Sequence, residues 1–119
     1  MLKYTEDHEW LRTEGDEIAV GITAHASEQL GDVVFIELPE EGREVEAGEE
    51  VVVIESVKAA SDIVSPVAGT ITAVNSALAD APGGVNEDAM SAWFFRLKPR
   101  DGTSLDGFMD EAGYNDLIG

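Results

Sequence analysis

The feature of this sequence that most constrains its fold is a series of short β-branched runs separated by turn-forming residues. Val, Ile and Thr favour extended backbone because their branched side chains pack well on a pleated sheet. Gly15-Asp16 predicts a hairpin between the first two runs, and Pro39 ends another. The predicted strands cover residues 8–14, 17–23, 32–38, 50–55, 69–74 and 93–97. Many short strands with closely spaced turns predict a small, mostly β sandwich.

A short helix is predicted between the second and third strands. Thr23 can cap a helix over residues 24–30, because its hydroxyl can accept a hydrogen bond from a free backbone N–H of the first turn. Gly31 would end this helix in a left-handed conformation. The helix would lie at the periphery of the sandwich.

A second helix is predicted near the end of the chain. Its sign is a set of apolar residues at positions i, i+3, i+4 and i+7, namely Leu105, Phe108, Met109 and Ala112. Thr103 or Ser104 would cap this helix, and Gly113 would end it.

The length of the chain suits one compact domain. A chain of 119 residues can bury a core without disulfides or metals. We expect a single domain over residues 1–119, with a core sandwich over about 4–98 and a C-terminal helical segment over about 103–118. No apolar run approaches the ~20 residues that a membrane helix needs.

A short motif, P-x-x-G, occurs twice, starting at Pro39 and at Pro66. Each copy is expected to turn the chain into a strand, and together they bracket the segment 50–64. The repeat suits a sandwich built from two similar halves.

The composition excludes several classes of function. The chain has 25 acids against 7 bases and a net charge of −18, so neither nucleic acid nor an anionic membrane is expected as a partner. There is no cysteine, which excludes disulfides, thiolate metal sites and a cysteine nucleophile. His8 and His25 lack a recognisable metal-ligand spacing, and we expect no metal. The N-terminal residues have neither an apolar signal core nor an Arg-rich transit segment, so we expect a cytoplasmic protein or a mature form.

One lysine stands apart from the other bases. Lys58 is the only Lys or Arg between Arg43 and Arg96. Its nearest charged neighbours are Glu55 and Asp62, and acidic neighbours raise the pKa of an amine, which makes a poor nucleophile or base. Because Lys58 lies between two predicted strands, we expect it at the tip of a tight turn with its side chain in water. A covalent attachment site is the better interpretation.

An ordered set of motifs surrounds this lysine and extends through most of the chain. The set comprises K-Y-T-E-D-H-E-W, V-G-I-T-A-H-A-S-E-Q-L-G-D-V-V-F-I-E-L-P, G-R-E-V-E-A-G-E-E, E-S-V-K-A-A-S-D followed by S-P-V-A-G, V-N-E-D and Y-N-D-L-I. It closely resembles the H-protein family of the glycine cleavage system. The resemblance implies a lipoyl-domain-like flattened barrel or sandwich (a barrel-sandwich hybrid), which agrees with the fold predicted from the strand pattern.

The resemblance implies a carrier with no catalytic site of its own. Lipoate would be joined to the Lys58 amine as an amide, and its dithiolane would supply the sulfur chemistry. The implied partners are a glycine decarboxylase (the P protein), an aminomethyltransferase (the T protein), a dihydrolipoamide dehydrogenase (the L protein) and the enzyme that attaches lipoate. The carrier would take the aminomethyl group from the first to the second and present the dithiol to the third. The location would be cytoplasmic in a bacterium, or the mitochondrial matrix for a mature eukaryotic form.

The resemblance also assigns roles to four other residues. Glu9 and Asp62 would line a cleft for the loaded arm, because a carboxylate can accept a charge-assisted hydrogen bond from the amine of the cargo. Glu55 and Gly69 would take part in recognition of the modification site. Replacing either one, as Glu55→Ala or Gly69→Val, is expected to impair modification more than stability.

Alternatives from other classes remain open at this point. A biotinyl carrier domain has a lysine at a similar turn, but methionines typically flank that lysine, whereas Val57 and Ala59 are the neighbours here. A lipoyl domain of a 2-oxoacid dehydrogenase usually has Asp directly before its lysine. An unmodified acidic interaction protein is a further alternative if Lys58 is bare.

One loop departs from the pattern of the family. Relatives usually have a larger apolar residue where Gly84 lies, and P-Y-G-x-G where residues 89–92 lie. Gly83 and Gly84 raise the entropy cost of ordering this segment, and no conformation is predicted for residues 83–92.

Overall fold

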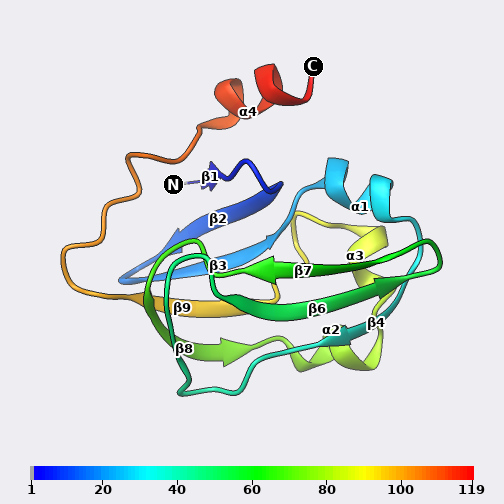
Figure 1. The fold of residues 1–119 in the computed structure, drawn as a ribbon, viewed down its shortest axis with the longest axis horizontal. Helices are drawn as coiled ribbons and strands as arrows, with labels where there is room; N and C mark the ends of the chain where they lie inside the picture. The colour runs from blue at the N-terminus through cyan, green and yellow to red at the C-terminus, as the bar shows by residue number, and fades with distance from the viewer. Residues whose placement is uncertain (1) are drawn as a thin grey trace.

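The computed structural model describes residues 2–119 and confirms a mostly β fold of two antiparallel sheets stacked as an open, flattened sandwich (Figure 1). The larger sheet contains, in spatial order, β1 (Leu2–Tyr4), β2 (Glu9–Glu14), β3 (Glu17–Ile22), β9 (Phe95–Pro99), β8 (Gly69–Val74) and β5 (Glu44–Val45). The smaller sheet contains β4 (Val33–Glu37), β6 (Glu50–Ser56) and β7 (Ala60–Val64).

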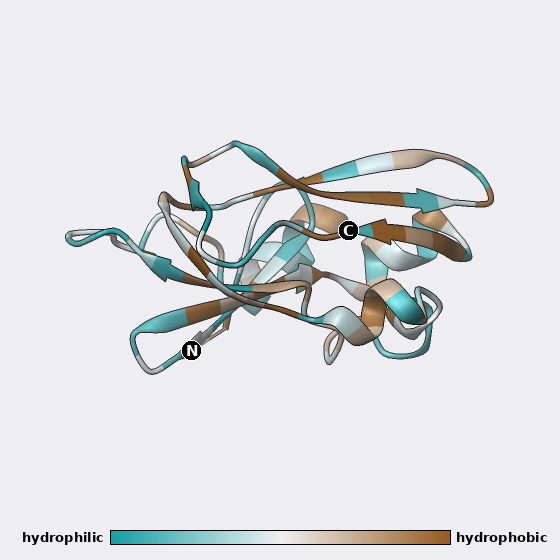
Figure 2. Ribbon diagram, turned by 90° about the horizontal axis from the view of Figure 1, so that it is seen from below, coloured by the Kyte–Doolittle hydropathy of each residue, from teal (hydrophilic) through white to brown (hydrophobic). Residues whose placement is uncertain are grey.

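The core lies between these two sheets. Figure 2 views the sandwich from the side and shows hydrophobic stretches in the strands of both layers. Successive residues of a strand point to opposite faces, so the side chains that fill this core come mainly from one face of each sheet, whereas Trp10 and Ala19 are buried in a second cluster with Tyr4 and Tyr114. Examples from the core between the sheets are Leu11, Val20, Val52, Ile54, Ile71 and Leu97. Burial of each such side chain contributes about 1.5–3 kcal/mol to folding.

Most predicted strands are present with small shifts in their bounds. The β2–β3 hairpin turns at Gly15, which has a φ of 66°, and β8 has the predicted bounds. β9 begins at Phe95, two residues later than predicted. The reason is local: the carbonyl of Trp93 accepts a hydrogen bond from the side chain of Asn75 and takes no part in the strand ladder.

The repeated P-x-x-G motif leads into two strands that pair with each other. β5 follows the first copy and β8 the second, and Val45 is opposite Gly69 in the antiparallel ladder. The backbone N–H of Gly42 also donates to the carbonyl of Ile71. The expectation that each copy turns the chain into a strand is therefore confirmed.

The helix after β3 is confirmed in its bounds and its N-cap, whereas the left-handed C-cap expected at Gly31 is not present. α1 covers Ala24–Leu30, and the Thr23 hydroxyl accepts a hydrogen bond from the Ala26 N–H. Gly31 has a φ of 77°, as expected for a residue that stops a helix, although its ψ of −157° lies outside the left-handed helical region.

The predicted C-terminal helix is wrong in position. α4 covers Glu111–Ile118, so residues 103–109 precede it. Asp110 is the cap, and its carboxylate accepts a hydrogen bond from the N–H of Gly113, which lies inside the helix. Met109 is not helical because its backbone N–H and C=O both pair with Tyr4 of β1. The apolar spacing of residues 105–112 reflects packing of an irregular segment.

Three short elements are not predicted from the sequence: β1, α2 (Ser76–Asp80) and α3 (Gly84–Glu87). Each is shorter than the window over which hydrophobic periodicity becomes visible, so it depends on its neighbours. None of the helices described in residues 2–119 has the length and apolar composition needed to span a lipid bilayer.

Candidate functional site

The lysine predicted as an attachment site lies in the tight turn between β6 and β7. The backbone N–H of Ser56 donates to the Ala59 carbonyl at 2.8 Å. The Ser56 hydroxyl accepts hydrogen bonds from the N–H groups of Lys58 and Ala59 at 3.2 and 3.1 Å. Val57 donates its N–H to the carbonyl of Asp32, which ties the turn to the chain after α1. The turn is therefore a fixed platform whose polar groups are paired locally.

The Lys58 side chain is exposed and leaves the turn beside the end of α1. A Cβ added at Gly31 would lie 3.1 Å from Cε of Lys58, so the aliphatic stem of the lysine passes directly over this glycine. Lys58 forms no salt bridge with any residue in the described part of the chain. The amine is accessible to a modifying enzyme, and its stem lies against the residue that ends a helix bordering a cleft.

Asn86 fixes the loop that supports this stem. Its amide nitrogen donates to the carbonyl of Gly31 at 2.8 Å, and its amide oxygen accepts from the N–H of Val33 at 2.8 Å. A second contact, at 3.3 Å, joins it to the hydroxyl of Ser27. Asn86, which lies on α3, thus holds the connection between α1 and β4 in place by hydrogen bonds. The V-N-E-D motif contained this residue, but the sequence alone gave it no role.

The cleft beside α1, which we call the α1 cleft, has a volume of about 200 Å³. It lies between the start of β2, α1 and the β6–β7 hairpin. Its apolar lining comes from three strands and the helix and consists of Ile22, Ala26, Leu30, Ile54 and Ile63. Leu30 directly precedes Gly31, over which the Lys58 stem lies. The attachment site and the cleft are therefore connected along one helix end.

Glu9 and Asp62, the two acids expected in a cleft, both line the α1 cleft. Asp62 is exposed on β7, whereas only 2% of the Glu9 surface is accessible. The Glu9 carboxyl accepts hydrogen bonds from the Val64 N–H at 3.0 Å and from the Thr5 hydroxyl at 3.5 Å. The structure brings the two acids together, and their part in holding a cargo stays a prediction.

Burial gives Glu9 an unusual protonation state. Loss of solvent raises the pKa of its carboxyl from 4.5 to about 8, the hydrogen bond from Val64 opposes this shift, and the charge of Asp7 adds to it. Glu9 is therefore largely neutral at pH 7. Glu9 was expected from the sequence to be an ionised carboxylate, and it differs because its burial depends on the packing of β2 against β7.

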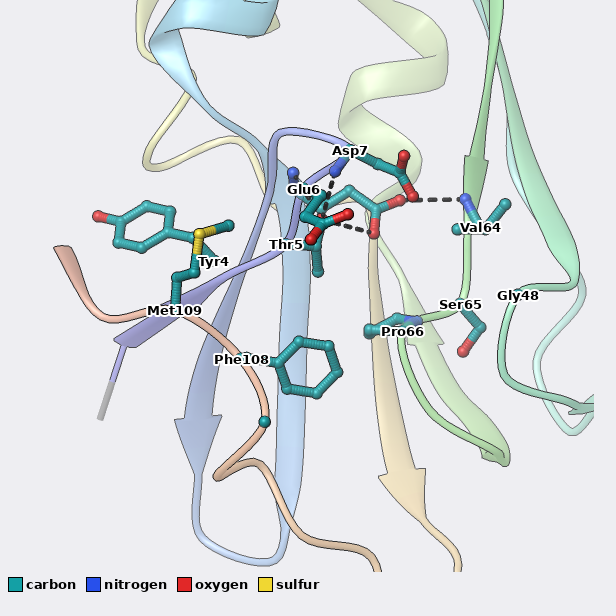
Figure 3. A pocket seen from close by; sticks show the side chains of 12 residues that line it. Tyr4, Thr5, Glu6, Asp7, Gly48, Val64, Ser65, Pro66, Phe108 and Met109 are labelled. Carbon is teal, nitrogen blue, oxygen red and sulfur yellow. Dashed lines mark hydrogen bonds between the residues drawn. The ribbon is translucent and has the colours of Figure 1, made fainter. Parts of the chain in front are cut away.

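A second cavity, of about 320 Å³, lies on the other side of Glu9. Asp7 and Glu9 line both cavities. Figure 3 shows this second cavity with Phe108 and Met109 on one side and Pro66 and Val64 on the other, and it draws the hydrogen bond that the Val64 backbone donates. The Glu9 carboxyl thus separates the α1 cleft from a hollow covered by the segment before α4.

His8 also lines the α1 cleft. It has a φ of 65° and is the only residue other than glycine with a positive φ among residues 2–119. Its ring lies 2.8 Å, measured from Nδ1, from the hydroxyl of Tyr114 on α4. The sequence spacing indicates no metal ligand here, and no group of three or more His, Asp or Glu residues in the described chain could hold a metal ion.

The two residues expected in recognition of the modification site lie in different places. Glu55 is exposed on β6 and borders the same shallow hollow as Lys58. Gly69 begins β8 in the other sheet, and β8 begins at the opposite end of the molecule from the β6–β7 turn (Figure 1). A Cβ at Gly69 would lie 2.3 Å from the carbonyl oxygen of Lys98. This geometry gives Gly69 a packing role, and its part in recognition stays a prediction.

Comparison with known proteins places the chain in one family. A family model described as Glycine cleavage H-protein matches residues 2–119. A glycine cleavage system H protein from Burkholderia vietnamiensis is 56% identical over 118 residues, which are 98% of this chain and 94% of that protein. A protein of the same name from Beijerinckia indica is 56% identical over 119 residues, 99% of this chain and 96% of its own.

The fold gives the same answer. The crystal structure of a glycine cleavage system H protein from Mycobacterium marinum superposes with a TM-score of 0.88 at 37% sequence identity, covering 99% of this chain and 96% of that one. The resemblance read from the motifs is confirmed by sequence and by structure over nearly the full length. The chain belongs to the glycine cleavage H-protein family.

Proposed function

We propose that this protein is the lipoyl-bearing carrier of a glycine cleavage system, with lipoate attached as an amide to Lys58. Its family membership supports the system. The assignment of the attachment site is supported by the β6–β7 turn. There, an exposed amine without an acidic partner projects from a backbone that Ser56 fixes. The family model and the relatives named above favour this system over biotinyl and 2-oxoacid dehydrogenase domains.

The residues around Lys58 fit a lipoyl group. The arm is a flexible apolar chain that ends in a dithiolane, and the α1 cleft offers an apolar lining of matching character that starts next to the lysine stem. When bound, the group supplies the sulfur that holds the aminomethyl cargo. The protein's own part is to bind, orient and shield the arm.

The far end of the cleft suits the amine of the cargo. Glu9 is largely neutral in the free protein because it is buried. A cationic amine nearby favours the ionised form of a carboxyl group and lowers its pKa. When an ammonium group docks, Glu9 therefore releases its proton to solvent. When a neutral amine docks, the amine accepts the proton of Glu9. In either case the result is an ammonium–carboxylate pair in a shielded site, with Asp62 at its exposed rim.

The carrier role implies four enzymes as partners. A glycine decarboxylase would load the arm, an aminomethyltransferase would unload it, and a dihydrolipoamide dehydrogenase would reoxidise the dithiol. A lipoyl-attaching enzyme would modify Lys58. Because the similar proteins named above are bacterial, we place this protein with these enzymes in a bacterial cytoplasm.

Intact-mass measurement of the protein from its native cell tests the attachment. The expected mass is that of the chain plus one lipoyl group, with peptide mapping to Lys58. A biotinyl adduct or a bare lysine in cells with an active glycine cleavage system would contradict the proposal.

A double variant tests the cleft. Glu9→Gln with Asp62→Asn should leave lipoylation unchanged and shorten the lifetime of the loaded form by roughly 10-fold or more, because a charge-assisted contact contributes about 1.5–3 kcal/mol. Glu40→Gln with Asp80→Asn is the control for the amide substitutions, since both residues are exposed acids that do not line the α1 cleft. If both double variants lose the cargo at the same rate as wild type, Glu9 and Asp62 do not hold it.

A further inference from the structure

One hydroxyl group joins the C-terminal helix to two walls of the α1 cleft. Tyr114 of α4 is only 4% exposed, and its hydroxyl lies 2.8 Å from Nδ1 of His8 and 2.7 Å from the hydroxyl of Thr23. His8 and Thr23 are separated from Tyr114 by most of the chain. The three polar groups form a single buried or half-buried network, and neither the strand pattern nor the motifs indicated it.

On one side the network holds a residue in an uncommon conformation. The φ of 65° at His8 is rarely adopted by residues other than glycine, so it persists only where surrounding contacts impose it. The backbone N–H of His8 donates to the carbonyl of Thr5, and its carbonyl accepts from the N–H of Thr23. These bonds fix the backbone, while the Tyr114 hydroxyl fixes the ring. His8 lines the α1 cleft directly before Glu9.

On the other side the network holds the start of α1. The Thr23 hydroxyl caps this helix through the Ala26 N–H at 3.2 Å. Ala26 and Leu30 are in the lining of the α1 cleft. A shift of Thr23 therefore moves the helical wall of the cleft and the end of α1, over which the Lys58 stem passes.

The Tyr114 ring has a separate packing role. It stacks on Tyr4 of β1 with ring centroids 4.7 Å apart and an interplanar angle of 12°. This stacking holds α4 against the edge of the larger sheet. Removing the hydroxyl alone keeps the stacking and therefore separates the two roles.

We infer that Tyr114 is a positioning residue for the loaded arm: its hydroxyl holds His8 and the N-terminus of α1 at a fixed separation and so sets the width of the α1 cleft at its Glu9 end. The inference rests on the proposed carrier function, in which this cleft receives the arm. It assigns the C-terminal helix a part in retaining the cargo, although α4 itself does not line the cleft.

The Tyr114→Phe variant tests this role, with Tyr4→Phe as the matched control. Both changes remove one phenol hydroxyl from the same stacked pair, but only the first breaks the contacts to His8 and Thr23. Two readouts are independent of the cargo: the ¹⁵N chemical shift of His8 Nδ1, and hydrogen exchange of the Ala26 amide in the unlipoylated protein. Both should change in Tyr114→Phe and remain as in wild type in Tyr4→Phe.

A third readout uses the lipoylated and loaded protein. Tyr114→Phe should be lipoylated on Lys58 to the wild-type extent and lose its cargo about fivefold faster, which corresponds to about 1 kcal/mol of the energy of the two hydrogen bonds that its hydroxyl makes. Thr23→Ser keeps the hydroxyl and should behave as wild type. Absence of lipoate on Lys58 in all variants and in wild type would instead overturn the proposed function.

The inference on Tyr114 is overturned if Tyr114→Phe and Tyr4→Phe give the same His8 and Ala26 signals. It is also overturned if the cleft signals change but a folded Tyr114→Phe protein retains its cargo as long as wild type does.

Discussion

The lysine turn and the α1 cleft are built in opposite ways. The turn is made from consecutive residues whose hydrogen bonds lie mostly within residues 56–59, chiefly at Ser56, with one further bond from the Val57 N–H to the Asp32 carbonyl. The cleft is assembled from β2, β3, α1 and the β6–β7 hairpin, with Glu9 buried in its wall and Tyr114 of α4 behind it. We therefore expect attachment of the arm to depend on local sequence and holding of the arm to depend on the whole fold. Substitutions in the two regions should have separable effects.

The largest expected effect comes from the turn itself. Lys58→Arg keeps a positive charge but cannot form the amide, so lipoylation and carrier activity should be lost completely while the melting temperature stays unchanged, because the side chain is exposed. Lys98→Arg is the control. Peptide mapping of modified protein checks the result, and lipoate on Lys3 or Lys98 would contradict it.

The next effect tests whether Gly69 belongs to the turn or to the fold. Gly69→Val places a Cβ 2.3 Å from the Lys98 carbonyl, a contact that the backbone of β9 must move to relieve. We expect a loss of about 3 kcal/mol or more in the free energy of unfolding, measured with urea. This revises the expectation from the sequence, which was a larger effect on modification than on stability.

Gly83→Ala is the control for that variant, because nothing lies within 4 Å of an added Cβ there. It should change stability by no more than about 1 kcal/mol, in the stabilising direction. A stable Gly69→Val protein that is poorly lipoylated would restore the role of Gly69 in recognition.

The third effect concerns the buried carboxyl of the cleft. Its pKa rises from 4.5 to about 8 on folding, so the protonated form is favoured in the folded state. The stability that Glu9 contributes is fully present below pH 4.5 and is lost as the pH rises through about 8. Glu9→Gln removes this dependence, and the variant should gain roughly 1–3 kcal/mol relative to wild type between these two pH values.

Urea unfolding at pH 4.5 and pH 8.5 measures this gain. Glu44→Gln, at an exposed position of β5, should show no such pH-dependent difference. A Glu9→Gln variant whose stability relative to wild type is the same at both pH values would show that Glu9 ionises freely in its site.

The smallest effects are expected from the rest of the turn. Ser56→Ala removes a hydroxyl that accepts two backbone N–H groups in an exposed loop, which should cost about 0.5–1 kcal/mol of stability. Glu55→Ala should not change stability. Both should lower the kcat/KM of a lipoyl-attaching enzyme severalfold in a purified assay. If both variants are modified at the wild-type rate, this enzyme recognises neither the turn conformation that Ser56 fixes nor the side chain of Glu55.

The same contrast explains what the sequence could and could not predict. The strands, the bounds and N-cap of α1 and the position of Lys58 follow from short-range patterns, and the structure has them as expected. The helix expected over residues 105–112 fails because Met109 pairs with Tyr4, more than 100 residues away in the chain.

The chemistry of the cleft could not be predicted from the sequence either, because it also depends on contacts between distant parts of the chain. The motifs pointed to Glu9 and Asp62, but the pKa of Glu9 depends on burial that β2 and β7 create together. No signal in the sequence connected Tyr114 with His8, because this contact exists only once α4 has packed on β1.

The distribution of the basic residues has a consequence for how the carrier meets its partners. Five bases are neutralised in salt bridges on or beside the larger sheet, namely Arg12, Arg43, Arg96, Lys98 and Arg100. Amide formation at Lys58, if it takes place as proposed, would remove the positive charge of the turn and leave the protein one unit more negative than −18. A more negative carrier would meet an enzyme with a basic surface faster, and this acceleration would weaken as ionic strength rises. Modification would then change both the cargo that the carrier can hold and the rate at which it meets such an enzyme.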